Sequence, residues 1–213
     1  MDYLEKIASH VEEGRNSDIG NCVDLALREG IPVRDVVEKG IVAGIERLGE
    51  KWKEGKAYLP EVLIAVRAAQ AGFKFLEPAL AKSTPVTKAK VIIGTIEGDM
   101  HSIGKDLVKL VLQASGFTVI DLGVDVTPGR FQQVVADEKP DILGISALLT
   151  TTMTSIPRVV EALTESGLRP GVKVILGGAP LDEEFARKAG ADAYAKDCFQ
   201  AAELATTFVQ LSR

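Results

Sequence analysis

The sequence predicts an α/β protein: an N-terminal four-helix bundle, residues 1–84, followed by a C-terminal flavodoxin-like (Rossmann-type) domain with a five-stranded parallel sheet, residues 85–213. Two observations carry this prediction. Apolar residues recur at helical spacing as far as about residue 81. After the polar stretch at 82–88, short apolar runs alternate with amphipathic segments, which is typical of parallel βαβ units.

Four helices are expected in the N-terminal part. Apolar residues indicate a first helix over 3–11 and a second over 19–27. Pro32 fits the first turn of a third helix, whose apolar stripe follows steps of three and four through Val33, Val37, Ile41, Ile45, Leu48 and Trp52. Pro60 opens a fourth helix that runs to about Ala81. Because the links between them are short, these helices form a small bundle.

Five strands are expected in the C-terminal part, over 90–95, 117–122, 141–146, 172–176 and, more weakly, 191–195. The first run, KVIIGT, is continuously apolar, as a strand buried on both faces should be. Amphipathic helices are expected between and after them, at about 104–115, 128–137, 155–167, 181–189 and 199–211. Such units commonly take the strand order 2-1-3-4-5, and ligands then bind beyond the carboxyl ends of strands 1 and 3.

Composition and charge exclude several classes of function. The 213 residues carry 25 Lys and Arg against 30 Asp and Glu, a net charge of −5, and neither half has the basic excess that nucleic-acid binding requires. No apolar run approaches the roughly 18 residues of a membrane span. The two cysteines, Cys22 and Cys198, are far apart and indicate no disulfide framework. We therefore expect a cytoplasmic protein with neither nucleic acid nor membrane as partner.

The loop after the first strand holds His101, one of only two histidines. Histidine is the commonest nitrogen ligand of transition metals, and a ligating histidine usually donates its other ring N–H to a carboxylate. Asp99 can supply that carboxylate, while Gly98 and Gly104 let the backbone approach a ligand. A satisfied loop histidine beside a capping aspartate fits these residue types equally well. His10 lies on the polar face of the first helix and is interpreted as a surface residue.

The loop after the third strand is polar, and the fourth strand ends in two glycines, which have no side chain. Ser146 opens a stretch rich in hydroxyls, of which Thr154 or Ser155 is expected to cap the next helix. One cap does not account for so many hydroxyls, and a polar ligand surface is therefore favoured. Gly177 and Gly178 end the fourth strand, where either a ligand or a bare tight turn explains paired glycines. A single histidine backed by one carboxylate suits a metal held in a macrocycle better than a bare ion.

Together the three loops match a known pattern. Asp99-x-His101-x-x-Gly104, then 41 residues, Ser146-x-Leu148, then 28 residues, and Gly177-Gly178 resembles the cobalamin-binding signature. Nearly the whole chain resembles the small corrinoid proteins of methyltransferase systems and the cobalamin-binding module of methionine synthase.

The resemblance implies a role for each matching residue. His101 would be the lower axial ligand of cobalt, in place of the benzimidazole of cobalamin, and Asp99 and Ser146 would continue a hydrogen-bond relay from its imidazole. Gly177 and Gly178 would leave room for the displaced nucleotide tail. The other residues lining cofactor and tail would be Gly98, Met100, Ser102, Ile103, Gly104, Leu148, Thr150, Tyr194 and Cys198. Thr152 stands where methionine synthase has a relay serine, and Cys198 either packs or senses redox state.

In the helical half, residues 49–60 match the cap segment of the family without gaps. Trp52 and Leu59 would cover the upper, reactive face of the corrin, and Glu38 would reach its edge. Core packing is the alternative for Trp52, since it lies on an apolar stripe.

The resemblance implies a carrier of a methyl group on cobalt, with no complete enzyme activity alone. Its partners would be a substrate-specific methyltransferase, an acceptor methyltransferase and a reductive activator protein. Methanol, methylamines, glycine betaine and aryl methyl ethers all fit as donors, and tetrahydrofolate or a thiol fits as acceptor. The alternatives are a cobalamin-binding sensor and the small subunit of an adenosylcobalamin-dependent mutase.

Overall fold

The computed structural model describes residues 2–80 and 89–211. The chain divides into a helical unit and a strand-containing unit, and each is considered by itself. The boundary expected at residues 84 and 85 lies outside the described residues. No helix in the described ranges is long and apolar enough to span a membrane.

The helical unit contains the expected helices. They are α1 (Tyr3–Glu12), α2 (Asn16–Arg28), a third helix built from α3 (Val33–Asp35), η1 (Val36–Val42) and α4 (Ala43–Lys53), and α5 (Leu59–Leu80). The third helix differs from expectation because η1 is a π-helical segment within it. Asp2 begins α1 by accepting the Leu4 N–H at 3.1 Å. Fully buried side chains from all these helices, among them Ile7, Ile19, Ile41 and Ile45, form the core of this unit.

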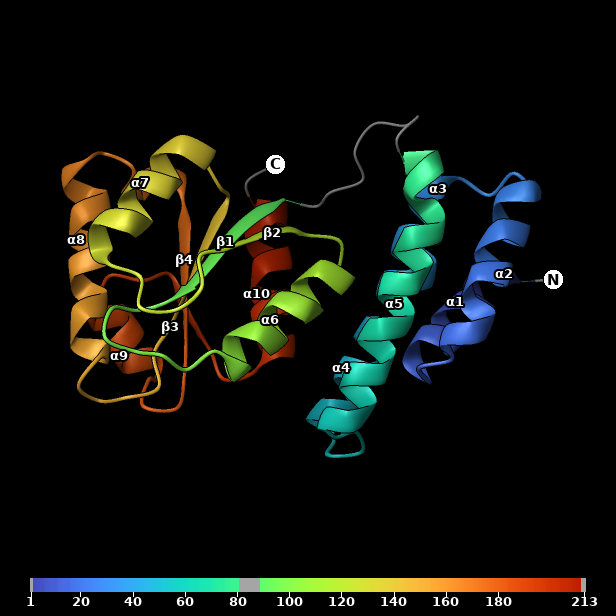
Figure 1. Cartoon of the computed structure of the whole chain (residues 1–213), viewed down its shortest axis with the longest axis horizontal. Helices are drawn as coiled ribbons and strands as arrows, with labels where there is room; N and C mark the ends of the chain where they lie inside the picture. The colour runs from blue at the N-terminus through green and yellow to red at the C-terminus, as the bar shows by residue number, and fades with distance from the viewer. Residues whose placement is uncertain (1, 81–88, 212–213) are drawn as a thin grey trace. The chain divides into compact units, whose positions relative to one another are not determined.

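The second unit is a parallel sheet with helices on both faces (Figure 1). Its strands are β1 (Lys90–Thr95), β2 (Thr118–Asp121), β3 (Ile142–Ser146), β4 (Lys173–Gly177) and β5 (Ala193–Ala195). Its longer helices are α6 (Ile103–Ala114), α7 (Pro128–Glu138), α8 (Ile156–Glu165), α9 (Glu183–Lys188) and α10 (Cys198–Leu211), with 3-10 turns η2 (Met153–Ser155) and η3 (Arg169–Gly171). The order β2-β1-β3-β4-β5 confirms the prediction.

The register of the sheet brings the ends of four strands into one row. Thr95 pairs with Ser146, Ser146 with Gly177, and Gly177 with Ala195. In Figure 1, α7 and α8 cover one face of this sheet and α6 and α10 the other. Since all strands are parallel, the loops after β1, β2, β3 and β4 emerge at a common edge, where α/β proteins place their ligand sites.

A buried ion pair ties the start of α6 to the end of β2. The Lys105 side chain is only 3% exposed, and its ammonium lies 2.8 Å from Asp121 Oδ1 and 2.8 Å from Asp106 Oδ1. Burial lowers the pKa of Lys105, but hydrogen bonds to the two carboxylates raise it more, so that its pKa lies above the ordinary value. Lys109, 34% exposed, reaches the same Asp121 at 3.2 Å.

Replacing Lys105 by methionine is expected to lower the free energy of unfolding by about 3 kcal/mol, because Asp121 loses its buried partner. Urea denaturation followed by circular dichroism measures this change. Lys109→Met is the matched control, with an expected loss of about 0–1 kcal/mol because its ammonium is partly in water. Equal losses for the two variants would contradict the importance assigned to the buried pair.

Candidate functional site

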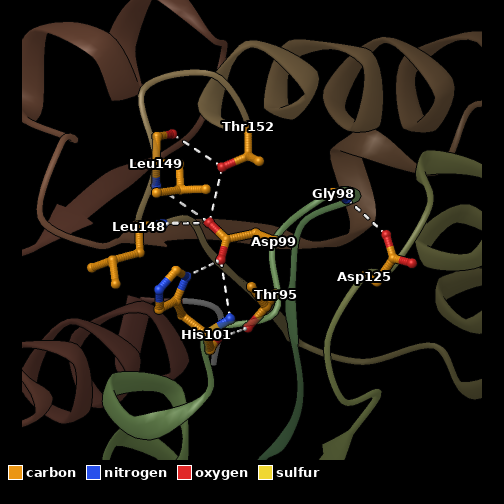
Figure 2. Close-up of polar contacts among 8 residues, drawn as sticks. All are labelled: Thr95, Gly98, Asp99, His101, Asp125, Leu148, Leu149 and Thr152. Atoms are coloured by element: carbon orange, nitrogen blue, oxygen red, sulfur yellow. Dashed lines mark hydrogen bonds and ion pairs between the residues drawn. The ribbon is translucent and has the colours of Figure 1, made fainter.

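The candidate site lies at the common edge of the strands, on the loops that follow β1 and β3. His101 belongs to the segment between β1 and α6, and residues 147–152 lead from β3 to η2. Figure 2 shows that Asp99 stands between these loops, with its carboxylate directed toward His101 on one side and Thr152 on the other. The site is therefore organised around a single carboxylate.

Asp99 is fully buried, and both of its oxygens accept hydrogen bonds. Oδ1 accepts the backbone N–H of His101 at 3.1 Å and lies 2.7 Å from the imidazole Nδ1. Oδ2 accepts from the backbone N–H of Leu148 at 2.7 Å, from that of Leu149 at 3.3 Å and from the Thr152 hydroxyl at 2.9 Å. Burial by itself raises the pKa of Asp99, but these hydrogen bonds bring it well below the ordinary value. Asp99 is thus ionised at neutral pH.

The ionised carboxylate fixes the tautomer of His101. A carboxylate can only accept, so the close contact with Nδ1 requires the proton to be on Nδ1. The lone pair is then on Nε2, the nitrogen that is not engaged with Asp99. The imidazole is 52% exposed, which leaves this nitrogen within reach of a ligand. The arrangement is that of a metal-binding histidine held by a carboxylate.

The residues around His101 are unusually apolar for an exposed surface. Met100 is 70% exposed and Ile103 82%, and on the facing loop Leu148 and Leu149 are 42% and 41% exposed. An exposed apolar patch around a free ring nitrogen suits a flat, largely apolar macrocycle that carries its own metal. Among the described residues, no three His, Cys, Asp or Glu side chains come together to hold a bare metal ion. This donor set therefore fits a corrinoid.

The hydroxyl that reaches Asp99 is that of Thr152 and not, as expected, that of Ser146. Thr152 is buried and donates to Asp99, whereas no hydrogen bond joins Ser146 to Asp99 in the described part of the chain. Ser146 is the last residue of β3 and is fixed by the sheet, while Thr152 lies where the loop turns back over Asp99. The expectation that Ser146 continues the hydrogen-bond relay is therefore wrong. Thr152, which stands where methionine synthase has a relay serine, supplies the hydroxyl.

One further expectation about these loops is corrected, and the close packing at Gly178 has a structural cause. Neither Thr154 nor Ser155 caps α8 with its side chain, since the backbone at Ser155 is already helical and the Thr154 hydroxyl donates to the Thr151 carbonyl at 2.9 Å. At Gly178 a Cβ would lie 1.8 Å from the carbonyl oxygen of Ala147. Glycine is therefore required here by the close approach of the neighbouring backbone, and the room expected at Gly178 for the nucleotide tail stays a prediction. A Cβ at Gly177 would meet only the Ala195 oxygen, at 3.4 Å.

The remaining expected residues fall into three groups. Gly98, Met100 and Ser102 lie on the His101 loop, Ile103 and Gly104 begin α6, and Thr150 is exposed on the loop after β3. Tyr194 is in β5 and Cys198 begins α10. Glu38, Trp52 and Leu59 belong to the helical unit, where Glu38 accepts a bond from Arg34 at 2.9 Å and Leu59 is 43% exposed. Their approach to a cofactor remains a prediction.

Sequence reasoning missed two residues that hold the His101 loop. The fully buried Thr95 donates its hydroxyl to the carbonyl of His101 at 2.9 Å. Asp125, after β2, accepts the backbone N–H of Gly98 at 2.7 Å (Figure 2). The sequence did contain a signal for Thr95, because it is a polar residue at the end of an otherwise apolar strand. Nothing in the local sequence indicates the partner of Asp125.

Cys198 is unsuited to sensing redox state. Its side chain is buried, and burial together with the charge of Asp197 raises its pKa to about 12. Since the thiolate is the reactive form, we expect iodoacetamide to alkylate Cys198 in the folded protein more than about a hundredfold more slowly than in urea. Mass spectrometry of the timed reaction at pH 8 measures this ratio. Similar rates in the two states would contradict the burial of the thiol.

Comparisons with known proteins bear on both units. Residues 89–203 match a family model described as B12 binding domain, and residues 3–77 match a second model of the same description. A corrinoid protein of Desulfitobacterium hafniense is 38% identical over 208 residues, 96% of each chain. The trimethylamine corrinoid protein of Methanosarcina barkeri is 46% identical over 171 residues, 79% of each chain.

Solved structures agree with these matches. A cobalamin-binding protein from Desulfitobacterium hafniense superposes with a TM-score of 0.84 at 29% identity, covering 96% of this chain and 98% of the other. A chain of the methanol:cobalamin methyltransferase complex from Methanosarcina barkeri gives a TM-score of 0.85 at 28% identity, covering 98% and 80%.

Proposed function

Since this chain belongs to the B12-binding corrinoid proteins of methyltransferase systems, we propose that it carries a methyl group from a substrate-specific methyltransferase to a second, acceptor methyltransferase. When bound, the corrinoid supplies the cobalt that takes up and releases the methyl group. The observation that carries the proposal is the half-exposed His101 imidazole, oriented by Asp99 and surrounded by exposed apolar side chains.

Residues of the strand-containing unit would hold the cofactor from below. His101 would donate Nε2 to the metal, and Met100, Ile103 and Leu148 would contact the apolar ring. Gly177 ends β4, Tyr194 is in β5 and Cys198 begins α10, and all three are proposed to line the nucleotide tail. Gly98, Ser102, Gly104, Thr150 and Ser146 complete the proposed lining.

Asp99 would set the strength of the axial donor. By accepting the Nδ1 proton, the carboxylate raises the basicity of Nε2 and keeps the ring in one orientation. Thr152 and the Leu148 N–H hold the other carboxylate oxygen, so that Asp99 cannot turn away from the imidazole. These contacts fix the carboxylate and, through it, the orientation of the axial donor.

The helical unit would shield the cofactor between transfers. We propose that Trp52 and Leu59 cover the reactive face and that Glu38 reaches the edge of the ring, as the resemblance of residues 49–60 to the family's cap segment implies. This cap must move away before either partner enzyme can reach the metal.

A methyltransferase is the partner that the comparisons support. We further propose a methylated amine as donor, because several relatives are trimethylamine or dimethylamine corrinoid proteins. A thiol or tetrahydrofolate would be the acceptor, and a reductive activator would restore the cobalt after oxidation. The sensor and mutase alternatives gain no support from these relatives. Two buried free cysteines favour a cytoplasmic location.

A labelled-methyl assay tests this function. The cobalamin-loaded protein is incubated with trimethylamine, dimethylamine, methanol, glycine betaine or an aryl methyl ether, with and without the matching methyltransferase. We expect labelling of the protein from one donor, only when its methyltransferase is present, and onward transfer only when an acceptor enzyme is added. The mutase alternative would be favoured if no donor and methyltransferase labelled the protein and if the protein loaded with adenosylcobalamin were active together with a separate catalytic subunit.

A further inference from the structure

We propose that Asp125 is a positioning residue for the loop that presents His101, an inference that rests on the proposed role of His101 as axial ligand. Asp125 follows β2 and forms two hydrogen bonds with the loop after β1. Its carboxylate Oδ1 accepts the Gly98 N–H at 2.7 Å (Figure 2). Its own N–H donates to the Asp99 carbonyl at 3.0 Å. Asp125 thus holds both Gly98 and Asp99, the residue with the buried carboxylate, from one side.

The backbone at Asp125 indicates that this contact is enforced by its surroundings. Its φ of 55° lies in the left-handed region, which residues with a side chain seldom adopt. Among the described residues only Lys139, at the end of α7, shares this property without being a glycine. Aspartate tolerates the conformation better than most residues, and strained residues of this kind cluster at functional sites.

The neighbouring backbone shows how a displacement at Asp125 would reach His101. Val126 donates to the Thr95 carbonyl at 2.9 Å, and Ile96 and Val126 form a parallel bridge, so the segment around Asp125 extends the β1–β2 pairing beyond the strands. Gly98, at φ 81°, turns the chain there, and Asp99 follows directly. A shift of Gly98 would move the Asp99 carboxylate, whose contacts with Leu148 and with the imidazole are both 2.7 Å long.

Substitutions can separate the carboxylate of Asp125 from its backbone conformation. Asp125→Gly keeps the left-handed backbone without strain but removes the acceptor of the Gly98 N–H. Asp125→Asn keeps an oxygen at that position and also tolerates the conformation. Lys139→Gly is the matched control, because it makes the same glycine replacement at the other left-handed position, away from the loop.

The cobalt(II) form of the cobalamin-loaded protein provides the readout. With protein labelled with ¹⁵N at histidine and unlabelled cobalamin, a doublet splitting in its electron paramagnetic resonance spectrum would report cobalt bound by histidine and a triplet cobalt bound by the benzimidazole of the cofactor. The spectrum therefore measures the ratio of histidine-bound to histidine-free cobalt. We expect Asp125→Gly to lower this ratio about tenfold, the effect of losing a hydrogen bond to a charged group. Asp125→Asn and Lys139→Gly should match the wild type, and all variants should keep the same circular dichroism spectrum.

Hydrogen exchange of the apoprotein gives a second, cofactor-free measurement. We expect the Gly98 amide to exchange slowly in the wild type and faster in Asp125→Gly, with amides in β1 unchanged. An unprotected Gly98 amide in the wild type, or an unchanged nitrogen ratio in Asp125→Gly, would overturn the role of Asp125. A wild-type spectrum without axial nitrogen would overturn the assignment of His101 as ligand, and this inference with it.

Discussion

Replacing Asp99 by asparagine is expected to release His101 from cobalt and to lower the free energy of unfolding by about 2–4 kcal/mol. Each carboxylate oxygen accepts from at least two donors: Oδ1 from the backbone N–H and the Nδ1–H of His101, and Oδ2 from Leu148, Leu149 and Thr152. Whichever way the asparagine is turned, its NH₂ group faces N–H or O–H donors. One set of buried donors is therefore left unsatisfied.

Urea denaturation measures the stability loss, and the visible spectrum of the cobalamin-loaded variant reports the coordination. Asp137→Asn, at an exposed position in α7, is the control and should change neither. Because the folded-state pKa of Asp99 is depressed, its contribution is complete above about pH 4 and is lost as the pH falls toward the folded-state value. The difference between wild type and Asp99→Asn should shrink accordingly. A variant of wild-type stability at pH 7 would contradict this account.

Replacing His101 by alanine is also expected to have a large effect on the metal, but only a small one on the stability of the fold. The imidazole is half-exposed, and Asp99 keeps its contacts with Leu148 and Thr152, so the stability should fall by no more than about 1 kcal/mol. With protein labelled with ¹⁵N at histidine, the bound corrinoid should lose the splitting from an axial histidine nitrogen.

The control for His101→Ala is His10→Ala, which removes the other histidine, located in α1. This variant should bind and coordinate the corrinoid as the wild type does. An unchanged axial spectrum in His101→Ala would refute the assignment of the ligand, whereas a loss of several kcal/mol in stability would show that the imidazole is mainly structural.

The sheet order could be predicted because buried strands and amphipathic helices leave different periodicities in the sequence. The contact between Asp99 and His101 was also predictable, since residues two apart on a tight loop can close a hydrogen bond. The π-helical segment was not, because an apolar stripe with steps of three and four fits an unbroken α-helix equally well.

The partners of Asp99 from the facing loop could not be derived from local sequence. Ser146 and Thr152 are both hydroxyl residues after the same strand, and only the path of the loop decides which of them reaches the carboxylate. Asp125 contacts Gly98 across 27 positions, and only the pairing of β1 with β2 brings them together. In each case tertiary placement, and not residue type, decides the contact.

The most direct test of the account is the electron paramagnetic resonance spectrum of the cobalt(II) form, recorded with protein labelled with ¹⁵N at histidine and unlabelled cobalamin. If His101 is the axial ligand, the triplet splitting from ¹⁴N becomes a doublet, because the nuclear spin changes from one to one half. A triplet that persists would place the benzimidazole of the cofactor on the metal and would contradict the central claim.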